Sequence, residues 1–273
     1  MNNYQVYKNG DLINFDHSHK ISKTYDSEIL FIFHGLFGRG RNWQTFSKIL
    51  TKNENLIVIT VDLRNHGGNE FKKNHSYSLM MDDVIEIFNY LDIKKTNILG
   101  HSMGGKLAML LTLSQPEYVN KLIVADIAPV DYPVEQQNIV DSLLDLNLDL
   151  ITSRTQADQL LSNSIKEKFI RTFLIQNLEL CENKYRWSIN LLAIKEAMNN
   201  LRSFPFPQKI KSVEHETLCI YGQNSDYVTK ENSNAFGNFF LNRSFVEIEK
   251  AGHYLHVEQP EKFYEALINF LIK

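Results

Sequence analysis

Residues 96–113 read TNILGHSMGGKLAMLLTL, and this stretch decides the fold class. An apolar run typical of a strand (residues 96–99) leads into Gly100, and an apolar helical pattern (residues 104–113) begins at Gly104. Ser102 therefore stands at a corner between an expected strand and an expected helix. Because a side chain at Gly100 or Gly104 would collide with the adjoining elements, the two glycines indicate a tight strand–turn–helix corner.

Similar strand-and-helix units lie on both sides of this corner. Beyond residues 96–99, strands are expected at residues 29–34, 56–62, 121–125, 218–221 and 245–248. The remaining expected helices are residues 42–50, 79–91, 230–240 and 260–272. Two short strands, residues 4–7 and 12–15, flank the turn residues Asn9, Gly10 and Asp11 near the start of the chain. Such alternation is typical of a mostly parallel sheet covered by helices on both faces.

The segment 132–204 interrupts this alternation. It contains no convincing strand, and four helices are expected in it, at residues 134–144, 155–160, 165–176 and 187–199. Pro205 and Pro207 follow the last of them. Because open α/β sheets bind ligands at the carboxyl ends of their strands, we expect a helical lid (residues 132–204) over an α/β core (residues 1–131 and 205–273).

Composition bounds the partners that the protein can have. The chain has 273 residues, 43% of them hydrophobic, and a formal net charge of −3, so no basic excess points to nucleic acid. Its apolar runs are too short to span a bilayer and its first residues lack a signal-peptide pattern, so a cytoplasmic protein is expected. Cys181 and Cys219 show no metal-binding spacing and are interpreted as core thiols. No metal or cofactor is expected, and the sequence carries no signal for the oligomeric state.

The serine corner has a chemical interpretation. A bare G-x-S-x-G pattern occurs by chance as a glycine-rich turn, but between a strand and a helix it matches the nucleophile elbow of the α/β-hydrolase fold. We therefore predict an α/β-hydrolase fold with a mostly parallel eight-stranded sheet and a helical lid after the sixth strand. Ser102 is then the nucleophile.

A second glycine motif, His34-Gly35-Leu36-Phe37-Gly38, directly follows the expected strand at residues 29–34. In this fold the corresponding loop supplies one N–H group of the oxyanion hole, and the residue after the nucleophile supplies the other. We expect these donors to be Leu36 and Met103, whose fixed N–H dipoles would stabilise a tetrahedral oxyanion.

The expected base is His253, in the sequence Ala251-Gly252-His253 after the last strand. The chain has nine histidines, so position decides among them. The order of the fold is serine, acid, histidine, and His253 lies between the final strand and the closing helix. His101, inside the elbow, is expected to pack or hydrogen-bond there.

Two residues compete for the role of the acid. In many such enzymes the acid follows the strand after the lid, in a pattern G-x-x-D-x-x-V, but residues 222–228 place Ser225 at that position and Asp226 one residue later. One step along an extended chain turns a side chain to the other side. Asp126, at the end of the strand beside the nucleophile strand, is the second candidate, with a helix cap or a lid hinge as its alternative role.

The motifs in combination resemble one family. They are VDLRNHG (residues 61–67), GHSMGGK (100–106), DIAPV (126–130), RTFL (171–174), WSINL (187–191) and AGHYLH (251–256). They resemble YbfF-type bacterial esterases, which are similar to the mitochondrial abhydrolase-domain-11 proteins, over nearly the whole chain. The resemblance implies cofactor-free hydrolysis of esters, and of acyl-CoA thioesters as a further class. It also implies a tetrad of Ser102, Asp126, Ser225 and His253.

The family pattern has a serine where this chain has Gly68-Asn69, so the hydrogen bonding of that loop does not follow from the resemblance.

The expected activity is hydrolysis of carboxylic esters with short to medium acyl chains, through an acyl-enzyme on Ser102. A carbon–carbon bond hydrolase or a lyase would use the same Ser-His-Asp site, and only substrate assays separate these from an esterase. A dehalogenase or epoxide hydrolase needs an aspartate nucleophile, against which Ser102 argues. A non-enzymatic binding protein would normally lack one of the three residues.

The candidate substrate-binding residues are Phe37 and three lid residues, Phe173, Trp187 and Leu191. Helical spacing makes lid core the better interpretation for most of the apolar lid residues.

Overall fold

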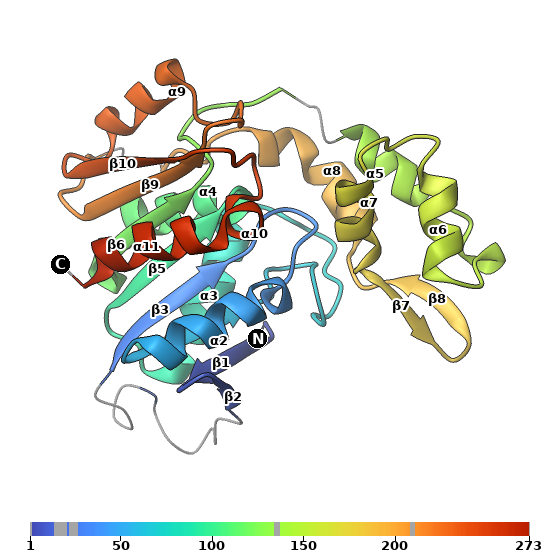
Figure 1. Cartoon of the computed structure of the whole chain (residues 1–273), viewed down its shortest axis with the longest axis horizontal. Coiled ribbons are helices and arrows are strands. Elements are labelled where there is room, and N and C mark those ends of the chain that lie inside the picture. The colour runs from blue at the N-terminus through green and yellow to red at the C-terminus, as the bar shows by residue number, and fades with distance from the viewer. Residues whose placement is uncertain (1, 14–20, 22–26, 134–136, 208–210, 273) are drawn as a thin grey trace.

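The computed structural model describes residues 2–13, 21, 27–133, 137–207 and 211–272. Eight strands form one sheet in the order β10-β9-β6-β5-β3-β4-β1-β2 (Figure 1). Their bounds are Tyr4–Lys8 (β1), Asp11–Ile13 (β2), Glu28–Phe33 (β3), Leu56–Val61 (β4), Thr96–His101 (β5), Val119–Ala125 (β6), Glu216–Gly222 (β9) and Arg243–Ile248 (β10). Among the described strands of this sheet, the antiparallel pairs are β1 with β2 and β1 with β4, and the other pairs are parallel. The expected mostly parallel, eight-stranded sheet is confirmed.

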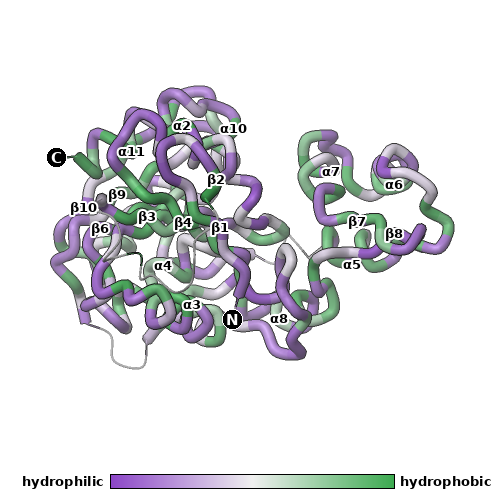
Figure 2. The backbone as a smooth tube through the Cα atoms, turned by 90° about the horizontal axis from the view of Figure 1, so that it is seen from below, coloured by the Kyte–Doolittle hydropathy of each residue, from purple (hydrophilic) through white to green (hydrophobic). Residues whose placement is uncertain are grey.

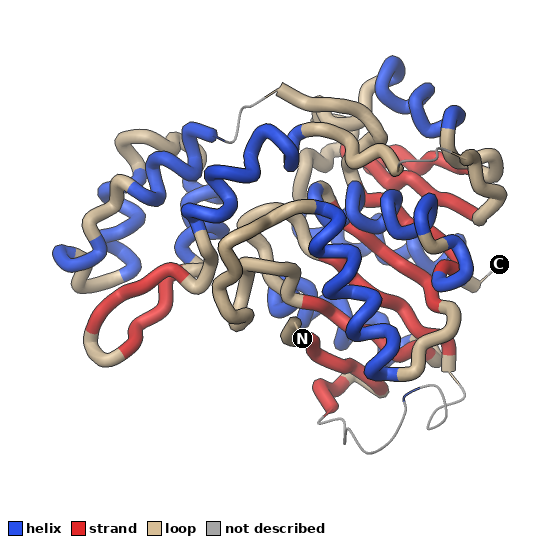
Figure 3. The backbone as a smooth tube through the Cα atoms, turned by 180° about the vertical axis from the view of Figure 1, so that it is seen from behind, coloured by secondary structure: helices blue, strands red, loops and turns tan. Residues whose placement is uncertain are grey.

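Helices cover both faces of the sheet (Figures 1 and 3). Successive side chains of a strand point to opposite faces, so Leu30 and Ile32 of β3 join one apolar cluster, and Phe31 and Phe33 the other. The first cluster is closed by α2 (Gln44–Asn53) and α11 (Pro260–Leu271), and the second by α3 (Tyr77–Leu91) and α4 (Met103–Ser114). Burial on both faces explains why the central strands are apolar at nearly every position (Figure 2).

Smaller elements complete the core. They are η1 (Gly40–Trp43), η2 (Pro116–Tyr118), α9 (Lys230–Asn234), η4 (Ala235–Asn238) and α10 (Leu255–Glu258). The expected hairpin near the start of the chain is confirmed, with Asn9 and Gly10 at φ values of 52° and 85° in the turn. Positions 14 and 15 of its expected second strand lie outside the described residues. The single helix expected at residues 230–240 is instead α9 followed by η4.

The insertion between β6 and β9 follows the sixth strand and extends to one side of the core (Figures 1 and 2). It contains α5 (Gln137–Leu144), η3 (Leu148–Leu150), α6 (Arg154–Leu161), α7 (Lys168–Ile175), β7 (Leu178–Cys181), β8 (Lys184–Trp187) and α8 (Leu191–Arg202). Residues 134–136 of the first expected helix lie outside the described residues.

Two expectations about the insertion are wrong. It does contain strands, because β7 and β8 form an antiparallel hairpin around Glu182 and Asn183, both at positive φ. The last helix starts at Leu191 rather than at residue 187, because the Asn190 side chain caps it by accepting a hydrogen bond from the Ala193 N–H at 3.2 Å.

Across the described ranges, no helix has the length and apolar character needed to cross a membrane.

Candidate active site

Ser102 occupies the corner between β5 and α4, with φ 53° and ψ −118°. Positive φ is costly for a residue with a Cβ, on the order of 1–2 kcal/mol, and persists only where the surroundings enforce it. Here the packing does so. A Cβ on Gly100 would lie 2.2 Å from the Gly104 carbonyl oxygen, and one on Gly104 would lie 2.3 Å from the Phe33 carbonyl oxygen. The corner therefore requires both glycines and presents Ser102 beyond the carboxyl end of the sheet.

Asp126 and His253 meet beside this corner, although they come from different loops. Asp126 follows β6 and is fully buried. The Nδ1–H of His253 donates to Asp126 Oδ2 at 2.7 Å. The Ser225 hydroxyl donates to the same oxygen, and the Gly222 N–H donates to Oδ1 at 3.1 Å. With Nδ1 as the donor, Nε2 of His253 keeps the lone pair that a general base needs.

The two candidate acids are clearly separated by the structure. Asp226 lines a cavity next to Ser102, and in the described part of the chain no hydrogen bond or ion pair joins it to His253. Asp126 is the carboxylate that holds the imidazole.

The loop after β3 packs closely against Ser102. A Cβ on Gly35 would lie only 3.2 Å from Ser102 Cβ. The Gly35 carbonyl accepts hydrogen bonds from His34 Nδ1 at 2.8 Å and from the Gly38 N–H at 3.0 Å. The C=O and N–H of a trans peptide point in opposite directions, so these bonds also orient the Leu36 N–H.

The N–H groups of Leu36 and Met103 have no acceptor among the residues described. Both residues line a cavity together with Ser102. Two free N–H groups beside the serine are what an oxyanion hole requires.

Two buried histidines support this loop. His34 Nε2 accepts from the Leu63 N–H at 2.9 Å, and His66 Nε2 accepts from the Phe37 N–H at 3.3 Å. Burial lowers the pKa of His34 to about 4 and the pKa of His66 to about 3, so both rings are neutral acceptors at pH 7. His66 was not singled out from the sequence, although it lies in the motif at residues 61–67.

The loop in which the chain departs from the family pattern is held by Asn69. Its Nδ2 donates to the carbonyls of Asp62 at 2.6 Å and Leu63 at 3.0 Å, and its Oδ1 accepts from the Asn3 N–H at 2.6 Å. The asparagine thus supplies the hydrogen bonds of this loop, where a serine was expected from the resemblance.

Aromatic side chains that sequence reasoning missed surround His253. The Tyr227 ring stacks on it with 4.1 Å between centroids. His101 Nε2 donates to the His253 carbonyl at 2.8 Å, so the elbow histidine does hydrogen-bond as expected. His256 stacks on Trp43 at 4.0 Å, and burial lowers its pKa to about 3.

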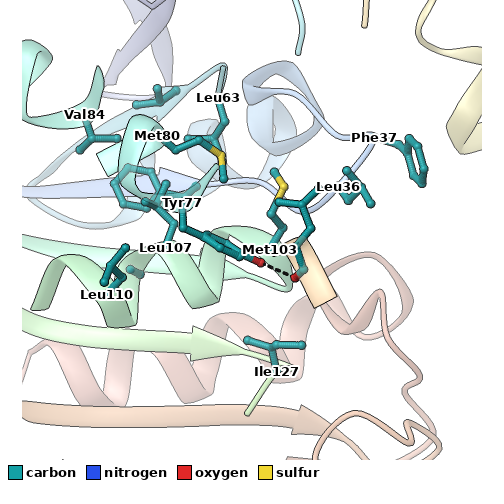
Figure 4. Close-up of a cluster of buried hydrophobic side chains, with 14 of the residues drawn as sticks. Leu36, Phe37, Leu63, Tyr77, Met80, Val84, Met103, Leu107, Leu110 and Ile127 are labelled. Carbon is teal, nitrogen blue, oxygen red and sulfur yellow. Dashed lines mark hydrogen bonds between the residues drawn. The ribbon is translucent and has the colours of Figure 1, made fainter. Parts of the chain in front are cut away.

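Two cavities meet at Ser102. One, of about 360 Å³, is also lined by Tyr77, Met103 and Leu201. Figure 4 shows Leu36 and Met103 next to Tyr77, whose hydroxyl donates to the Leu201 carbonyl at 2.8 Å. The other cavity, of about 250 Å³, extends from His253 toward the insertion.

The candidate substrate-binding residues divide between these cavities and the core. Phe37 and Phe173 line the smaller cavity. Trp187 and Leu191 line neither cavity. They pack instead in the apolar cluster that contains Phe31 and Phe33.

A buried lysine joins the nucleophile helix to the insertion. Lys106 Nζ donates to the carbonyls of Arg202 at 2.5 Å and Ser203 at 3.2 Å, at the end of α8. Burial lowers its pKa to about 7.

Cys181 and Cys219 are both free thiols. Cys219 is a buried core thiol as expected, but Cys181 ends the hairpin strand β7 and is only partly buried, so the core interpretation is wrong for it. Within the ranges that the structure describes, no group of three His, Cys, Asp or Glu side chains is arranged to hold a metal ion.

Comparisons with known proteins identify the family of the chain. Residues 28–260 match the family model described as "alpha/beta hydrolase fold". The chain is 32% identical to "sn-1-specific diacylglycerol lipase ABHD11" of Danio rerio, over 90% of this chain and 79% of that protein. It is 28% identical to "Esterase YbfF" of Escherichia coli (strain K12), over 90% and 94%. The solved structure titled "Marine microorganism esterase" superposes with a TM-score of 0.86 at 34% identity, covering 90% of this chain and 96% of that one.

Proposed function

Because the chain belongs to the α/β-hydrolase family, we propose that it is a serine esterase that cleaves carboxylic esters through an acyl-enzyme on Ser102. The observation that carries this proposal is the contact of His253 Nδ1 with the buried Asp126, at 2.7 Å, beside a serine in an elbow conformation. A base, its orienting carboxylate and a nucleophile then share one edge of the sheet, together with two free N–H groups.

The proposed cycle uses the same groups in both half-reactions, with His253 acting first as a base and then as an acid in each. His253 Nε2 takes the hydroxyl proton as Ser102 Oγ attacks the ester carbonyl, and the N–H groups of Leu36 and Met103 stabilise the oxyanion. The intermediate collapses, and the alcohol leaves with the proton from His253. Water then attacks the acyl-enzyme with the same assistance and releases the carboxylic acid.

Asp126 holds the imidazole in the tautomer that has its proton on Nδ1. Ser225 donates to the same carboxylate oxygen, so it restricts the rotation of Asp126 as well. Gly222 fixes the second oxygen at 3.1 Å. The acid is therefore held by three donors in all, which supports a fixed orientation of His253.

We further propose that residues 132–204 act as a lid over the site and that the two cavities at Ser102 hold the acyl and alcohol parts of the substrate. The volumes, about 360 and 250 Å³, favour short to medium acyl chains. Acyl-CoA thioesters are a further proposed class, because thioester cleavage passes through the same acyl-enzyme.

A fluorophosphonate probe tests the nucleophile. The native protein should be labelled at Ser102, and Ser102→Ala should lose both the label and on the order of 10³-fold or more in kcat. Labelling that persists in this variant, or a native protein that cleaves none of a panel of esters and acyl-CoAs, would refute the assignment.

The same panel, with graded acyl lengths, tests the lid. Phe173→Ala enlarges the smaller cavity and should shift the preferred acyl length, whereas Leu191→Ala, which lies outside both cavities, should leave the preference unchanged. Equal rates for all lengths in all three proteins would contradict a lid that shapes the site.

A further inference from the structure

The insertion touches the loop that carries the proposed oxyanion donor. Asn177, between α7 and β7, donates from Nδ2 to the Phe37 carbonyl at 2.7 Å. Asn177 is only 2% exposed, so this bond is shielded from water. Phe37 directly follows Leu36, whose N–H is one of the two free donors beside Ser102. A residue of the insertion thus lies one residue away from the proposed oxyanion hole.

The backbone of Asn177 is itself fixed within the insertion. Its N–H donates to the Leu174 carbonyl at 3.0 Å, at the end of α7. Its carbonyl accepts from the Ser188 N–H at 2.8 Å and from the Ser188 hydroxyl at 3.1 Å, which come from the segment after β8. The position of the amide donor is therefore set by the folding of the insertion and does not adapt freely to the loop.

Phe37 is held from the opposite side by the core. Its N–H donates to His66 Nε2, and its φ is 62°, a left-handed conformation that a residue with a side chain adopts at a cost. The two bonds clamp one residue between the core and the insertion. Releasing either bond would let Phe37 relax toward negative φ and would turn the Leu36–Phe37 peptide. The Leu36 N–H belongs to the next peptide back, Gly35–Leu36, and would be displaced through the Leu36 Cα that the two peptides share.

We propose that Asn177 is a positioning residue for ester hydrolysis. By holding the Phe37 carbonyl, it makes the orientation of the Leu36 N–H toward the oxyanion depend on the contact between the insertion and the core. The proposal rests on the proposed function. It gives the insertion a part in stabilising the transition state in addition to its part in shaping the cavities.

Asn177→Leu is the main test. Leucine has a similar volume, removes the donor to Phe37, and also removes Oδ1, a buried acceptor with no partner among the described residues. The matched control is Gln176→Ala. Gln176 is the neighbouring residue, and its side-chain oxygen also accepts a bond from the core, from Asn42 Nδ2 at 2.6 Å, but it does not touch Phe37.

The measurements are kcat and KM for p-nitrophenyl acetate and the Ki of a trifluoromethyl ketone. This inhibitor adds to Ser102: Oγ bonds to the carbonyl carbon, the hydroxyl proton passes to His253, and the carbonyl oxygen becomes an oxyanion in the hole. Removal of an oxyanion donor costs about 10²–10³ in kcat, so a misaimed donor should cost about 10- to 100-fold in Asn177→Leu. KM should change by less than about threefold, since the loss falls on the transition state, and the Ki should rise by the same factor as kcat falls. Gln176→Ala should stay within about threefold of the native protein in all three quantities, because its bond is exposed.

Unchanged kcat in Asn177→Leu would overturn the proposal, as would a rise in KM alone or a fall in kcat without a rise in the Ki. If Asn177→Leu does not fold, as judged by circular dichroism, Asn177→Ala replaces it with the same expectations. Failure of the proposed function has a different signature, because the native protein itself would then neither react with a fluorophosphonate at Ser102 nor bind the ketone.

Discussion

The two sides of Ser102 both depend on histidine, but they place it in opposite environments. On the acid–base side, the His253 side chain is 18% exposed and donates to a buried carboxylate. On the oxyanion side, His34 and His66 are buried, their hydrogen bonds go to backbone groups, and their pKa values are lowered to about 4 and about 3. The comparison shows how one side chain serves two purposes. Beside a carboxylate and a cavity it can carry a proton, whereas in an apolar interior it is a fixed neutral acceptor.

This difference predicts two kinds of damage. Substitutions on the acid–base side should remove the proton acceptor, and the resulting loss of activity should depend strongly on pH. Changes on the oxyanion side should lower kcat and leave the shape of the pH profile intact.

The largest effect is expected on the acid–base side, for Asp126→Asn. Asparagine keeps the size of the side chain but favours the imidazole tautomer with its proton on Nε2, which in serine proteases costs about 10⁴ in kcat. Asp226→Asn is the matched control and should stay within about tenfold, since Asp226 makes no bond to His253 in the described structure. Steady-state kinetics on folded variants decide this. A nearly normal Asp126→Asn with an inactive Asp226→Asn would reverse the assignment of the acid.

The next effect tests the oxyanion side, through His66→Leu. This change leaves the buried Phe37 N–H without its acceptor, so the oxyanion loop should relax and kcat should fall by about 10- to 100-fold. His66→Gln offers a side-chain oxygen in place of the ring nitrogen and should recover part of the loss. The pH profile of the remaining activity should have the native shape. A profile shifted as in Asp126→Asn would contradict the separation of the two sides.

A smaller effect is expected for Ser225→Ala. The variant loses one donor to Asp126 and retains both the His253 contact and the Gly222 N–H. One hydrogen bond has a net value of about 0.5–1.5 kcal/mol, which corresponds to a loss of about 2- to 13-fold in kcat. A loss as large as that of Asp126→Asn would mean that Ser225 holds the carboxylate in place almost alone.

The smallest effect on kcat is expected for a substitution of His75. Its ring lies next to that of His66, with 5.7 Å between the centroids. Both of its ring nitrogens are buried without a partner among the described residues, and burial lowers its pKa to about 3. The pKa of His75 is lower in the folded state than in the unfolded state. Above pH 6.5 the ring is mostly neutral in both states, so the free energy of unfolding is not reduced there. Below that pH the unfolded state takes up a proton that the folded state refuses, and the free energy of unfolding falls.

His75→Phe should therefore be more stable than the native protein by about 2 kcal/mol at pH 5 but within about 1 kcal/mol of it at pH 7. Urea denaturation at the two pH values measures this, and kcat at pH 7 should not change by more than about twofold. An equal change in the free energy of unfolding at both pH values would exclude proton uptake by His75 as the cause.

The sequence allowed the sheet and the chemistry at its edge to be predicted, because those features are fixed by local requirements. The elbow needs glycine at positions 100 and 104, where any Cβ would meet backbone atoms. Buried strands need continuous apolar runs, and the order of strands places Ser102, Asp126 and His253 at one edge of the sheet.

What escaped prediction depends on contacts between distant segments. Nothing local to Tyr227 indicates that its ring stacks on His253, and nothing local to Asn177 indicates its bond to Phe37. The hairpin of β7 and β8 was missed for a different reason. Its turn places Glu182 at φ 49°, a position for which asparagine or glycine would have been the recognisable signal.

The two tryptophans of the chain are distributed one to each region. Trp43, in η1 of the core, is stacked on His256, and Trp187 ends β8 in the insertion. Intrinsic fluorescence therefore reports on both regions at once, and a single substitution separates the two signals. With Trp43→Phe the tryptophan emission comes from the insertion alone, and with Trp187→Phe it comes from the core alone. The pair of variants would show, during a slow rise in urea, whether the insertion melts before the sheet or together with it.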